Sequence, residues 1–471
     1  MQKTSYLGLF GCEFADISRP VLLPSGALPK TIIGGAHHES MDGSGGAVSL
    51  TDDMTPSRAL SLGTKLGSVC LKVAVGRDAN PSSQMIAAAF MAGLTSAGAD
   101  AIDAGIIPAP GLCIAFRDRV DCTVHVGSPD DYGHIAGIRI RLPEGSPFPL
   151  ERLDGADGEL PPFSDVGCIR SEPGAVDAYI DSFPEGEGGG YILSDTGGNS
   201  TSVCADRILK KSGADPIGLN AHISGGAPPR SPGIDRAELA GLSSFVNAST
   251  GSIGIAFNGD GTRLALLDES GKFVPGDKLL AIMLLAVKPS KAVVPYASPS
   301  IVDDAFYRYR PRGKNGGGLI RHGNSLESIM KAAKDSGADF AGTLDGLFVF
   351  PKRTQCPDAL AAAAEISKLA GARSIRNVLE GFPRYTVRKT YVDFDGYFSA
   401  FTDRFLNSVK DADVSRVDGG GGLCIQMSRG ILYVNPDPSD PKRIEISAES
   451  GDPVYLATML DEAEELVRGS I

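Results

Sequence analysis

Val73–Pro110 reads VAVGRDANPSSQMIAAAFMAGLTSAGADAIDAGIIPAP, and the fold class follows from the pattern of this stretch. The apolar run Leu71–Val75 predicts a strand. Gln84–Ser96 then predicts a helix that stops at Gly98, because a glycine just past the last helical turn is a common stop signal. A new apolar run after Asp100 predicts a second strand. A strand, a helix and another strand at this spacing predict an α/β unit with a parallel sheet.

The same helix stop, Gly-Ala-Asp, recurs at Gly213 and Gly337, each time after a helical stretch and before apolar residues. New units begin with the apolar runs Tyr191–Leu193 and Ala292–Val294. A helix is also predicted at Ser57–Leu66. The repetition predicts three related α/β units in series.

From about residue 372 the pattern changes to that of a mostly antiparallel sheet followed by a final helix. The predicted strands and helix are Tyr385–Val392, Leu423–Gln426, Ile431–Val434, Arg443–Ile446 and Pro453–Arg468. The predicted fold class is therefore α/β, with three tandem related α/β domains that have mixed, largely parallel sheets, plus a smaller C-terminal α+β domain. We place the domains at 1–155, 156–275, 276–371 and 372–471. The first also holds an opening strand at Tyr6–Phe10 and a loop insertion at Pro20–Ser49.

Composition narrows the classes of function. The chain has 471 residues, 42% of them hydrophobic and 22% charged, which is typical of a globular protein. Its formal net charge of -12 argues against a nucleic-acid partner or an anionic membrane surface. No apolar run approaches the ~20 residues of a membrane helix, and no secretory signal opens the chain. The eight cysteines form no C-x-x-C pair, so we expect a reduced, cytoplasmic protein.

One polar loop stands out as a candidate site. Asn258-Gly259-Asp260-Gly261-Thr262-Arg263 separates the apolar runs Ile253–Phe257 and Leu264–Leu267. The two glycines let the backbone curl so that oxygen atoms converge on one point. An aspartate between the glycines and an arginine at the exit suit a cation beside a phosphate. A plain glycine turn between two strands explains the same residues equally well.

These segments resemble the α-D-phosphohexomutases, whose metal loop ordinarily reads Asp-Gly-Asp-Gly-Asp-Arg. Val73–Pro110 is similar to the family's first domain, and Ala227–Asp235, APPRSPGID, is similar to a second-domain segment reading Phe-Pro-x-x-x-Pro-x-Pro. Phe382–Lys389, FPRYTVRK, resembles the entry to the fourth domain. The resemblance covers nearly the whole chain. It implies a serine that carries a phosphoryl group, Mg²⁺ on three aspartates beside it, and phosphoryl exchange between the serine and a sugar phosphate.

The resemblance makes Ser128 the candidate phosphoserine. The family reads Thr-Ala-Ser-His-Asn-Pro where this chain has Val126–Asp131, VGSPDD. Asp130 and Asp131 would repel a phosphoserine. The alternative, a turn serine before Pro129, is the interpretation we favour, because serine before proline is ordinary turn chemistry.

By the same resemblance, Asn258, Asp260 and Thr262 are the metal ligands. Only Asp260 keeps a carboxylate, so the predicted Mg²⁺ binding is weak or absent. Arg263 and Arg230 are the arginines best suited to contact a phosphate.

Two further loops carry the remaining predicted substrate-binding residues. The family's sugar loop, Gly-Glu-x-Ser-Gly-His, corresponds to Gly342–Leu347, and its phosphate loop, Arg-Pro-Ser-Gly-Thr-Glu-Pro, corresponds to Asn435–Pro441. An extra proline removes a backbone donor from the second loop, and Asp437 adds negative charge. The predicted contacts are Thr343, Asp345, Asn435, Ser439 and Lys442.

Two functions remain open from the sequence. The first is a divergent phosphohexomutase that interconverts hexose 1- and 6-phosphates through phosphorylated Ser128, with ordinary turnover in doubt because all four loops depart from the family pattern. The alternative is a non-catalytic homologue that binds a sugar phosphate or acts as the subunit partner of an active mutase. The expected partners are a phosphorylated hexose and either a second copy of the chain or a paralogous mutase subunit, with no nucleic acid and no membrane.

Overall fold

The computed structural model describes residues 54–127, 137–156, 161–223, 225, 228–308, 318–383, 386–408, 413–416, 422–427, 429–437 and 440–471. The predicted strand Tyr6–Phe10, the insertion Pro20–Ser49 and the serine loop with Ser128 lie outside these residues.

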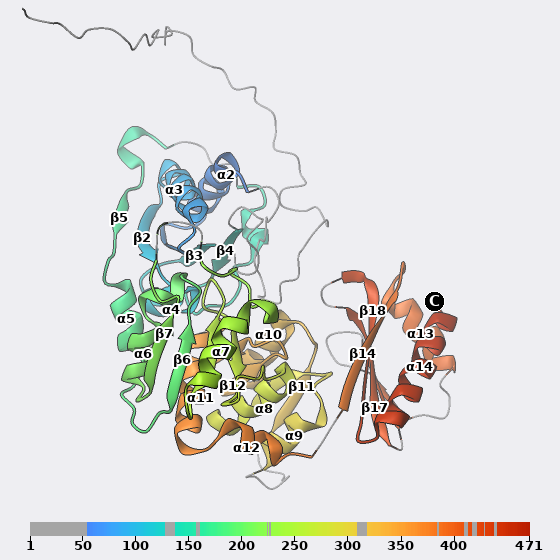
Figure 1. Cartoon of the computed structure of the whole chain (residues 1–471). Helices are drawn as coiled ribbons and strands as arrows, with labels where there is room; N and C mark the ends of the chain where they lie inside the picture. Colours follow the sequence, from blue (N-terminus) through green and yellow to red (C-terminus); the bar gives the residue numbers. More distant parts are fainter. Residues whose placement is uncertain are drawn as a thin grey trace, which may run out of the picture. The chain divides into compact units, whose positions relative to one another are not determined.

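Three sheets repeat one strand order (Figure 1). In the first, β1 (Lys72–Arg77) pairs in parallel with β2 (Asp100–Ile106) on one side and β3 (Cys122–Gly127) on the other. β4 (Gly137–Arg141) pairs antiparallel with β3, and β5 (Ile169–Ser171) extends the other edge beside β2. The resulting order is β4-β3-β1-β2-β5.

The second and third sheets have the orders β7-β6-β8-β9 and β11-β10-β12-β13, and each again ends in one antiparallel pair. Their strands are β6 (Tyr191–Asp195), β7 (Asp215–Leu219), β8 (Ile253–Phe257), β9 (Leu264–Leu267), β10 (Ala292–Pro295), β11 (Leu319–His322), β12 (Phe340–Gly342) and β13 (Phe348–Val349). The prediction of three related, largely parallel α/β units is confirmed. The connections β3–β4, β8–β9 and β12–β13 are equivalent in the three units. The serine loop lies in the first of these connections, the metal loop in the second and the sugar loop in the third.

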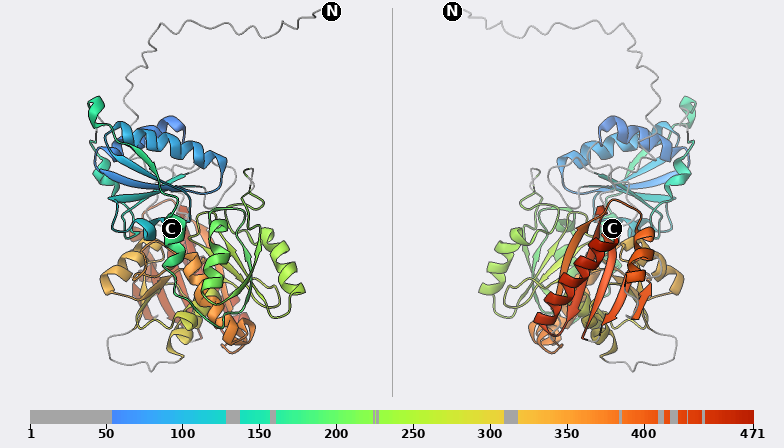
Figure 2. Two further views of the ribbon diagram at one scale, coloured as in Figure 1. Left: turned by 90° about the vertical axis from the view of Figure 1, so that its left-hand side faces the viewer. Right: turned by 90° about the vertical axis from the view of Figure 1, so that its right-hand side faces the viewer.

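Helices cover these sheets. They are α2 (Pro56–Gly67), α3 (Pro81–Ser96), α4 (Ala109–Phe116), α5 (Ala175–Asp181), α6 (Ala205–Lys211), α7 (Ala240–Ala248), α8 (Gly276–Val287), α9 (Ser300–Tyr307), α10 (Leu326–Ser336), α11 (Ala359–Ala372) and α12 (Ile375–Glu380). The three predicted stops follow α3, α6 and α10, where Gly98, Gly213 and Gly337 have φ of 93°, 90° and 63°. This left-handed backbone explains the choice of glycine at each stop. Figures 1 and 2 show α2 and α3 side by side on one face of the first sheet.

The second and third units share a hydrophobic core. One cluster joins Phe257 of β8, Leu280 of α8, Phe340 of β12 and Ala362 of α11, all fully buried. α11 follows the third sheet in the chain, yet it also contacts β6, β8 and β9 of the second. The shared core fixes the metal loop and the sugar loop relative to each other.

The C-terminal region has an antiparallel sheet of order β14-β18-β17-β16-β15, as predicted. Its elements are β14 (Thr386–Asp393), α13 (Phe398–Ser408), β15 (Asp413–Arg416), β16 (Leu423–Met427), β17 (Gly430–Asp437), β18 (Asp440–Ser450) and α14 (Pro453–Ser470). The right-hand view of Figure 2 shows α14 lying across one face of this sheet. The sequence did not predict α13, whose buried Phe401 and Phe405 complete the core of this domain.

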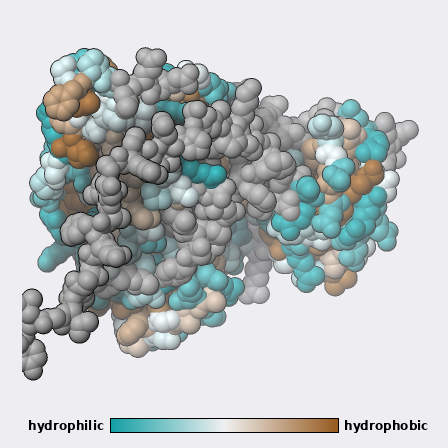
Figure 3. Space-filling model, turned by 90° about the horizontal axis from the view of Figure 1, so that it is seen from above, coloured by the Kyte–Doolittle hydropathy of each residue, from teal (hydrophilic) through white to brown (hydrophobic). Residues whose placement is uncertain are grey.

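On the face drawn in Figure 3, the hydrophobic residues form separate patches among hydrophilic ones. Within the described part of the chain, no helix has both the length and the apolar character needed to cross a membrane.

Candidate functional site

The metal loop is a buried junction of three units. Asn258 is 2% exposed, and Asp260 and Thr262 are fully buried. The backbone N–H of Ala109, at the start of α4, donates to the Asp260 carbonyl at 2.8 Å, and that of Ala359, at the start of α11, donates to the Gly261 carbonyl at 3.1 Å. The first and third units therefore both hold a loop that belongs to the second.

Gly261 has to be a glycine at this junction. Its φ is 75°, and a Cβ atom there would lie 2.8 Å from Cβ of Pro108. Both the left-handed backbone and the close approach exclude a larger residue.

The side chains of the three predicted metal ligands meet, but they bond to one another. The hydroxyl of Thr262 donates to Oδ1 of Asp260 at 2.6 Å, and the Thr262 backbone N–H donates to the same atom at 3.0 Å. Nδ2 of Asn258 donates to Oγ1 of Thr262 at 3.1 Å. Oδ1 of Asn258 accepts the backbone N–H of Arg263 at 2.9 Å. These bonds rigidify the loop and involve Oδ1 of Asp260, Oγ1 of Thr262 and Oδ1 of Asn258, whereas Oδ2 of Asp260 has no hydrogen-bond partner.

The second carboxylate oxygen of Asp260 faces an arginine from the first unit. Nη1 of Arg139, on β4, lies 4.0 Å from Oδ2 of Asp260, and both side chains are at most 2% exposed. Burial acts to raise the pKa of Asp260, but Arg139, His125 and the Thr262 hydrogen bonds outweigh it, so the pKa falls below its ordinary value. Asp260 is therefore a buried carboxylate whose counter-charge comes from the protein itself.

His125 lies beside this ion pair. It stands opposite Arg139 in the β3–β4 register, and its Nε2 is 3.0 Å from the carbonyl oxygen of Ile107. Burial lowers the pKa of His125 to about 4, against the opposing effect of Asp260. The imidazole is therefore neutral at neutral pH, and Arg139 is the cation that balances Asp260.

The residues of this loop do not fit a resident Mg²⁺. Mg²⁺ requires near-octahedral oxygen ligands, usually including carboxylates. Asp260 is the loop's single carboxylate, with one oxygen bonded to Thr262 and the other facing Arg139. Among the residues that the structure describes, no group of three or more His, Cys, Asp or Glu side chains is arranged to hold a metal ion.

Sequence reasoning did not assign Arg139 to the site. It belongs to Gly137–Arg141, GIRIR, whose alternation suggests a strand with its arginines in solvent, yet all five residues are buried. The sequence feature that could have pointed to Arg139 is its position as a charged residue in the strand that directly follows the serine loop. Its contact with Asp260 required knowing that β4 lies against the metal loop.

The sugar loop lies beside the metal loop. Arg263 and Leu347 form an antiparallel bridge, and the Leu264 N–H donates to the Gly346 carbonyl at 3.2 Å. Nη2 of Arg263 is 3.3 Å from Oδ2 of Asp345, with the two side chains 19% and 49% exposed. The buried Thr343 donates its hydroxyl to Oδ1 of Asp345. The structure thus brings together three predicted substrate-binding residues, and Asp345 and Arg263 are the accessible ones.

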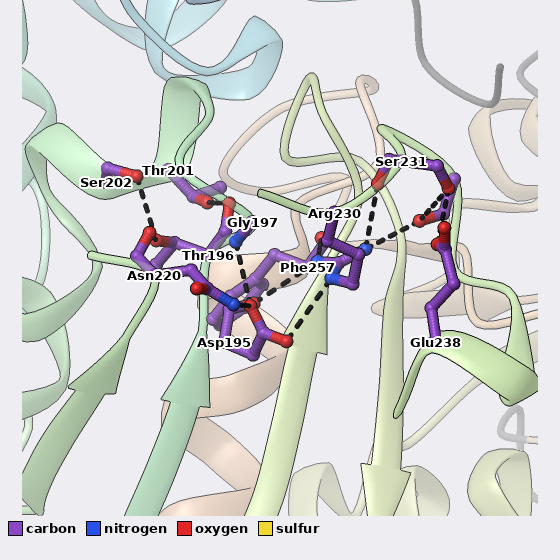
Figure 4. A network of polar contacts seen from close by, with 11 residues as sticks. Asp195, Thr196, Gly197, Thr201, Ser202, Asn220, Arg230, Ser231, Glu238 and Phe257 are labelled. Atoms are coloured by element: carbon purple, nitrogen blue, oxygen red, sulfur yellow. Dashed lines mark hydrogen bonds and ion pairs between the residues drawn. The ribbon is translucent and has the colours of Figure 1, made fainter. Parts of the chain in front are cut away.

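Arg230 lies beside the start of the metal loop, between the carboxyl ends of β6 and β8 (Figure 4). Its Nε is 3.3 Å from Oδ2 of Asp195, and its Nη2 donates to the Phe257 carbonyl at 2.6 Å. Its Nη1 donates to the Gly233 carbonyl at 2.6 Å. The side chain is 4% exposed and borders a hollow of about 440 Å³ that Asn220 and Phe245 also line. A phosphate contact from Arg230 stays a prediction, and it would compete with these bonds to protein oxygens.

The predicted phosphate segment is mostly strand. The sequence placed a seven-residue loop at Asn435–Pro441, but β17 continues to Asp437 and β18 starts at Asp440. Asn435, 2% exposed, pairs with Glu445 across the ladder. Oδ2 of Asp437 is 2.7 Å from Nη2 of Arg443, which explains how the buried Asp437 is tolerated.

Up to Asp437 the backbone is therefore paired in a β-sheet, and it does not form an anion-binding nest of N–H groups. Lys442 is exposed, and Ser439 lies outside the described residues. The phosphate contacts of Asn435, Ser439 and Lys442 stay predictions.

Comparison with known proteins agrees with this geometry. Residues 41–154 match the family model for phosphoglucomutase/phosphomannomutase, alpha/beta/alpha domain I. A probable phosphoglucosamine mutase of Methanosarcina barkeri is 27% identical over 436 residues, covering 89% of this chain and 96% of that protein.

Two solved structures share the fold. One is a phosphoglucomutase/phosphomannomutase family protein of Burkholderia thailandensis, which superposes with a TM-score of 0.74 at 20% identity over 92% of this chain and 98% of that one. The other is the Aspergillus fumigatus N-acetylphosphoglucosamine mutase in complex with GlcNAc-6P and magnesium, with a TM-score of 0.50 at 12% identity over 85% of this chain and 81% of that one. Residues 41–154 therefore carry the first domain of the phosphoglucomutase/phosphomannomutase family, and the chain as a whole is similar to phosphoglucosamine mutases and shares the fold of the two solved structures.

Proposed function

We propose that this chain binds a phosphorylated hexose at its sugar and metal loops and does not perform Mg²⁺-dependent mutase turnover. The observation that carries the proposal is the buried contact between Arg139 and Asp260, with the remaining loop oxygens bonded to one another. Full-length relatives named as phosphoglucosamine mutases support a hexose phosphate, with glucosamine phosphate as the first candidate.

Electrostatics favours Arg139 over a metal ion at Asp260. Two unit charges 4 Å apart interact with roughly 4 kcal/mol at an effective dielectric of about 20. A divalent cation that bound Asp260 would meet the Arg139 guanidinium at a similar distance and be repelled by it. Displacing Arg139 would also leave a buried charge without its partner, which costs about 3–5 kcal/mol. The loop is therefore electrostatically complete without a metal.

Binding uses the accessible part of the site. Asp345 is half exposed and carries a carboxylate that can accept hydrogen bonds from sugar hydroxyls. Arg263 lies next to it and can donate to a phosphate, for which a guanidinium is well suited. Binding to these two groups leaves the buried metal loop intact. The other form of this proposal, a subunit partner of an active mutase, uses the same surface for recognition.

A second candidate is residual phosphoryl transfer through Ser128. It is favoured by chain connectivity: Ser128 directly follows Gly127, the last residue of β3, which pairs with Gly137 two residues before Arg139. The strand that leads to Ser128 is therefore in the same sheet as Arg139. In this reading Ser128 passes its phosphoryl group to one sugar hydroxyl and recovers a phosphoryl group from the other, with weak Mg²⁺ at Asp260, Asn258 and Thr262.

Intact-mass measurement decides between the two candidates. The purified chain is incubated with a hexose 1,6-bisphosphate, with and without Mg²⁺, and glucosamine 6-phosphate binding is measured in parallel by calorimetry. We expect no added phosphoryl group and measurable binding that Asp345→Asn weakens. A phosphoryl group on Ser128 that Ser128→Ala abolishes, together with Mg²⁺-dependent turnover, would overturn the proposal. Stable co-purification with an active mutase, without glucosamine 6-phosphate binding, would support the subunit form.

A further inference from the structure

The hollow beside Arg230 lies where the strand order of the second sheet reverses. β6 pairs in parallel with β7 on one side and with β8 on the other, so successive connections run in opposite directions from β6. In open α/β sheets a crevice forms at such a point, outside the carboxyl ends of the strands, and small ligands bind in it. Asp195 ends β6 and Leu219 ends β7, and both line this hollow of about 440 Å³. The volume is in the range of small-ligand sites.

A buried ion pair forms one wall of the hollow, and its hydrogen bonds are made within the protein. The side chains of Arg230 and Asp195 are 4% and 5% exposed. A guanidinium has five N–H groups, and Arg230 makes hydrogen bonds to Oδ2 of Asp195 and to the carbonyl oxygens of Asp195, Ser231, Gly233 and Phe257. Oδ1 of Asp195 accepts Nδ2 of Asn220 at 3.1 Å. Arg230 therefore balances Asp195, and an anionic ligand would have to displace these bonds.

The polar groups that remain available are acceptors. Glu238 lines the hollow and is exposed, and its Oε2 accepts the hydroxyl of Ser231 at 2.7 Å. Figure 4 shows it at one end of the network that reaches Asn220 through Arg230 and Asp195. Among the residues that the structure describes, nothing donates to Oε1 of Glu238 or to Oδ1 of Asn220. Glu238 also has no ion-pair partner there, so it is the unbalanced charge of the lining.

Helix α7 contributes an aromatic ring and open space. Gly241 and Phe245 are four residues apart, so they lie on one face of the helix, and both line the hollow. Phe245 is 55% exposed, although a large aromatic side chain is favoured in contact with other apolar groups. A Cβ atom at Gly241 would meet nothing within 4 Å, so packing does not require glycine there. Glycine within a helix costs about 0.5–1 kcal/mol relative to alanine, and here it leaves room beside the ring.

We propose that this hollow binds a small hydroxylated amine without a phosphate group. Its ammonium group pairs with Glu238, a hydroxyl group donates to Oδ1 of Asn220, and its carbon skeleton packs against Phe245. An ammonium group has three donors and no acceptor, which complements a hollow whose available polar groups are acceptors. Leu219 and Leu242 add apolar surface to the same lining. The site does not rest on the proposed function of the sugar and metal loops.

Titration of the full chain with glucosamine and with glucose, followed by ligand-observed NMR at slightly acidic pH, tests the proposal. The two sugars differ in one substituent, an ammonium group in place of a hydroxyl group. Glucosamine is expected to bind about tenfold or more tightly than glucose, because its contact with Glu238 is charge-assisted. Glu238→Gln is expected to reduce this preference to about threefold or less without a change in Tm, since the side chain is exposed. Gly241→Ala is expected to weaken glucosamine binding several-fold while Tm stays unchanged or rises, which separates loss of binding from loss of folding.

Two control variants locate the binding. Asp215→Asn removes a negative charge from an exposed position at the start of β7, outside the lining, and glucosamine affinity is expected to stay within about twofold of the wild-type value. Asp345→Asn, in the sugar loop, is expected to have equally little effect.

Four results would each overturn the proposal. They are no glucosamine binding at millimolar concentration, equal affinity for glucose and glucosamine, an equal loss of affinity in Glu238→Gln and Asp215→Asn, and loss of glucosamine binding in Asp345→Asn. The last result would place the amine at the sugar loop and would leave the proposed function of that loop standing. Failure of glucosamine 6-phosphate binding with intact glucosamine binding would overturn the proposed function alone.

Discussion

Replacing Arg139 with glutamine removes the counter-charge of Asp260 while keeping a polar side chain of similar length. The two side chains are at most 2% exposed and their charged atoms are 4.0 Å apart, so the Asp260 carboxylate would remain buried without its partner. Breaking a buried pair in this way costs about 3–5 kcal/mol. For a cooperative unit of about 150–250 residues, each kcal/mol shifts Tm by about 2–4 °C, so the expected loss is about 6–20 °C.

Scanning calorimetry of the full chain measures this loss of stability. A second substitution tests whether the loss comes from the unpaired Asp260 carboxylate. The double variant Arg139→Gln/Asp260→Asn removes both charges of this pair, so it is expected to be more stable than Arg139→Gln alone. Arg119→Gln is the control: Arg119 is 49% exposed in its 2.7 Å pair with Glu172, and a surface pair contributes at most about 1 kcal/mol.

The same test includes a measurement of Tm with and without Mg²⁺. Wild-type Tm is expected to be unchanged by millimolar MgCl₂, because Arg139 already balances Asp260 and a ligand stabilises only what it binds. The reasoning is refuted if Arg139→Gln melts within about 2 °C of the wild type, a shift that corresponds to only about 1 kcal/mol or less. It is refuted equally if Mg²⁺ stabilises the wild type more than the variant.

Three further substitutions test other parts of the structure. His125 has a pKa of about 4 when folded and about 6.5 when unfolded, so the unfolded chain binds an extra proton as the pH falls between these values. Wild-type Tm should therefore drop as the pH falls from 6.5 towards 4, by the equivalent of at most ~3 kcal/mol of unfolding free energy. His125→Gln should reduce this pH dependence, and parallel curves of Tm against pH for the two proteins would contradict the prediction. Tyr179→Phe removes a 2.7 Å hydrogen bond from a buried hydroxyl to Oδ1 of Asp358 and should lower stability by about 1.5–3 kcal/mol, measured as the urea midpoint, and an unchanged midpoint would show that this bond contributes nothing. Gly261→Ala should lower the stability of the protein by at least about 1–2 kcal/mol, because residue 261 has a positive φ. In the control Gly241→Ala, on helix α7, the added Cβ meets open space, so this variant should be neutral or stabilising. Equal Tm values for the two variants would argue against strain at position 261.

The sequence by itself determined the α/β class, the three related units and the antiparallel C-terminal sheet. The reason is that these features follow from local chemistry. Gly98, Gly213 and Gly337 mark helix ends because the backbone there is left-handed, which glycine adopts without strain. Apolar runs such as Ala292–Val294 mark buried strands because parallel sheets are covered on both faces. The sequence also indicated the turn of the metal loop, because Gly261 has a positive φ that glycine adopts without strain.

Only the tertiary structure decided what the loops have as neighbours. Arg139 and Asp260 are far apart in sequence, and nothing local to either residue predicts their contact. Strands β17 and β18 extend into the predicted phosphate loop because the ladder and the Asp437–Arg443 pair favour continued pairing over a loop. The assigned roles of Ser128 and the other candidate residues stay predictions. Local propensity fixes which elements form, whereas the burial and pairing of charges depend on which elements pack together, and that is a property of the whole fold.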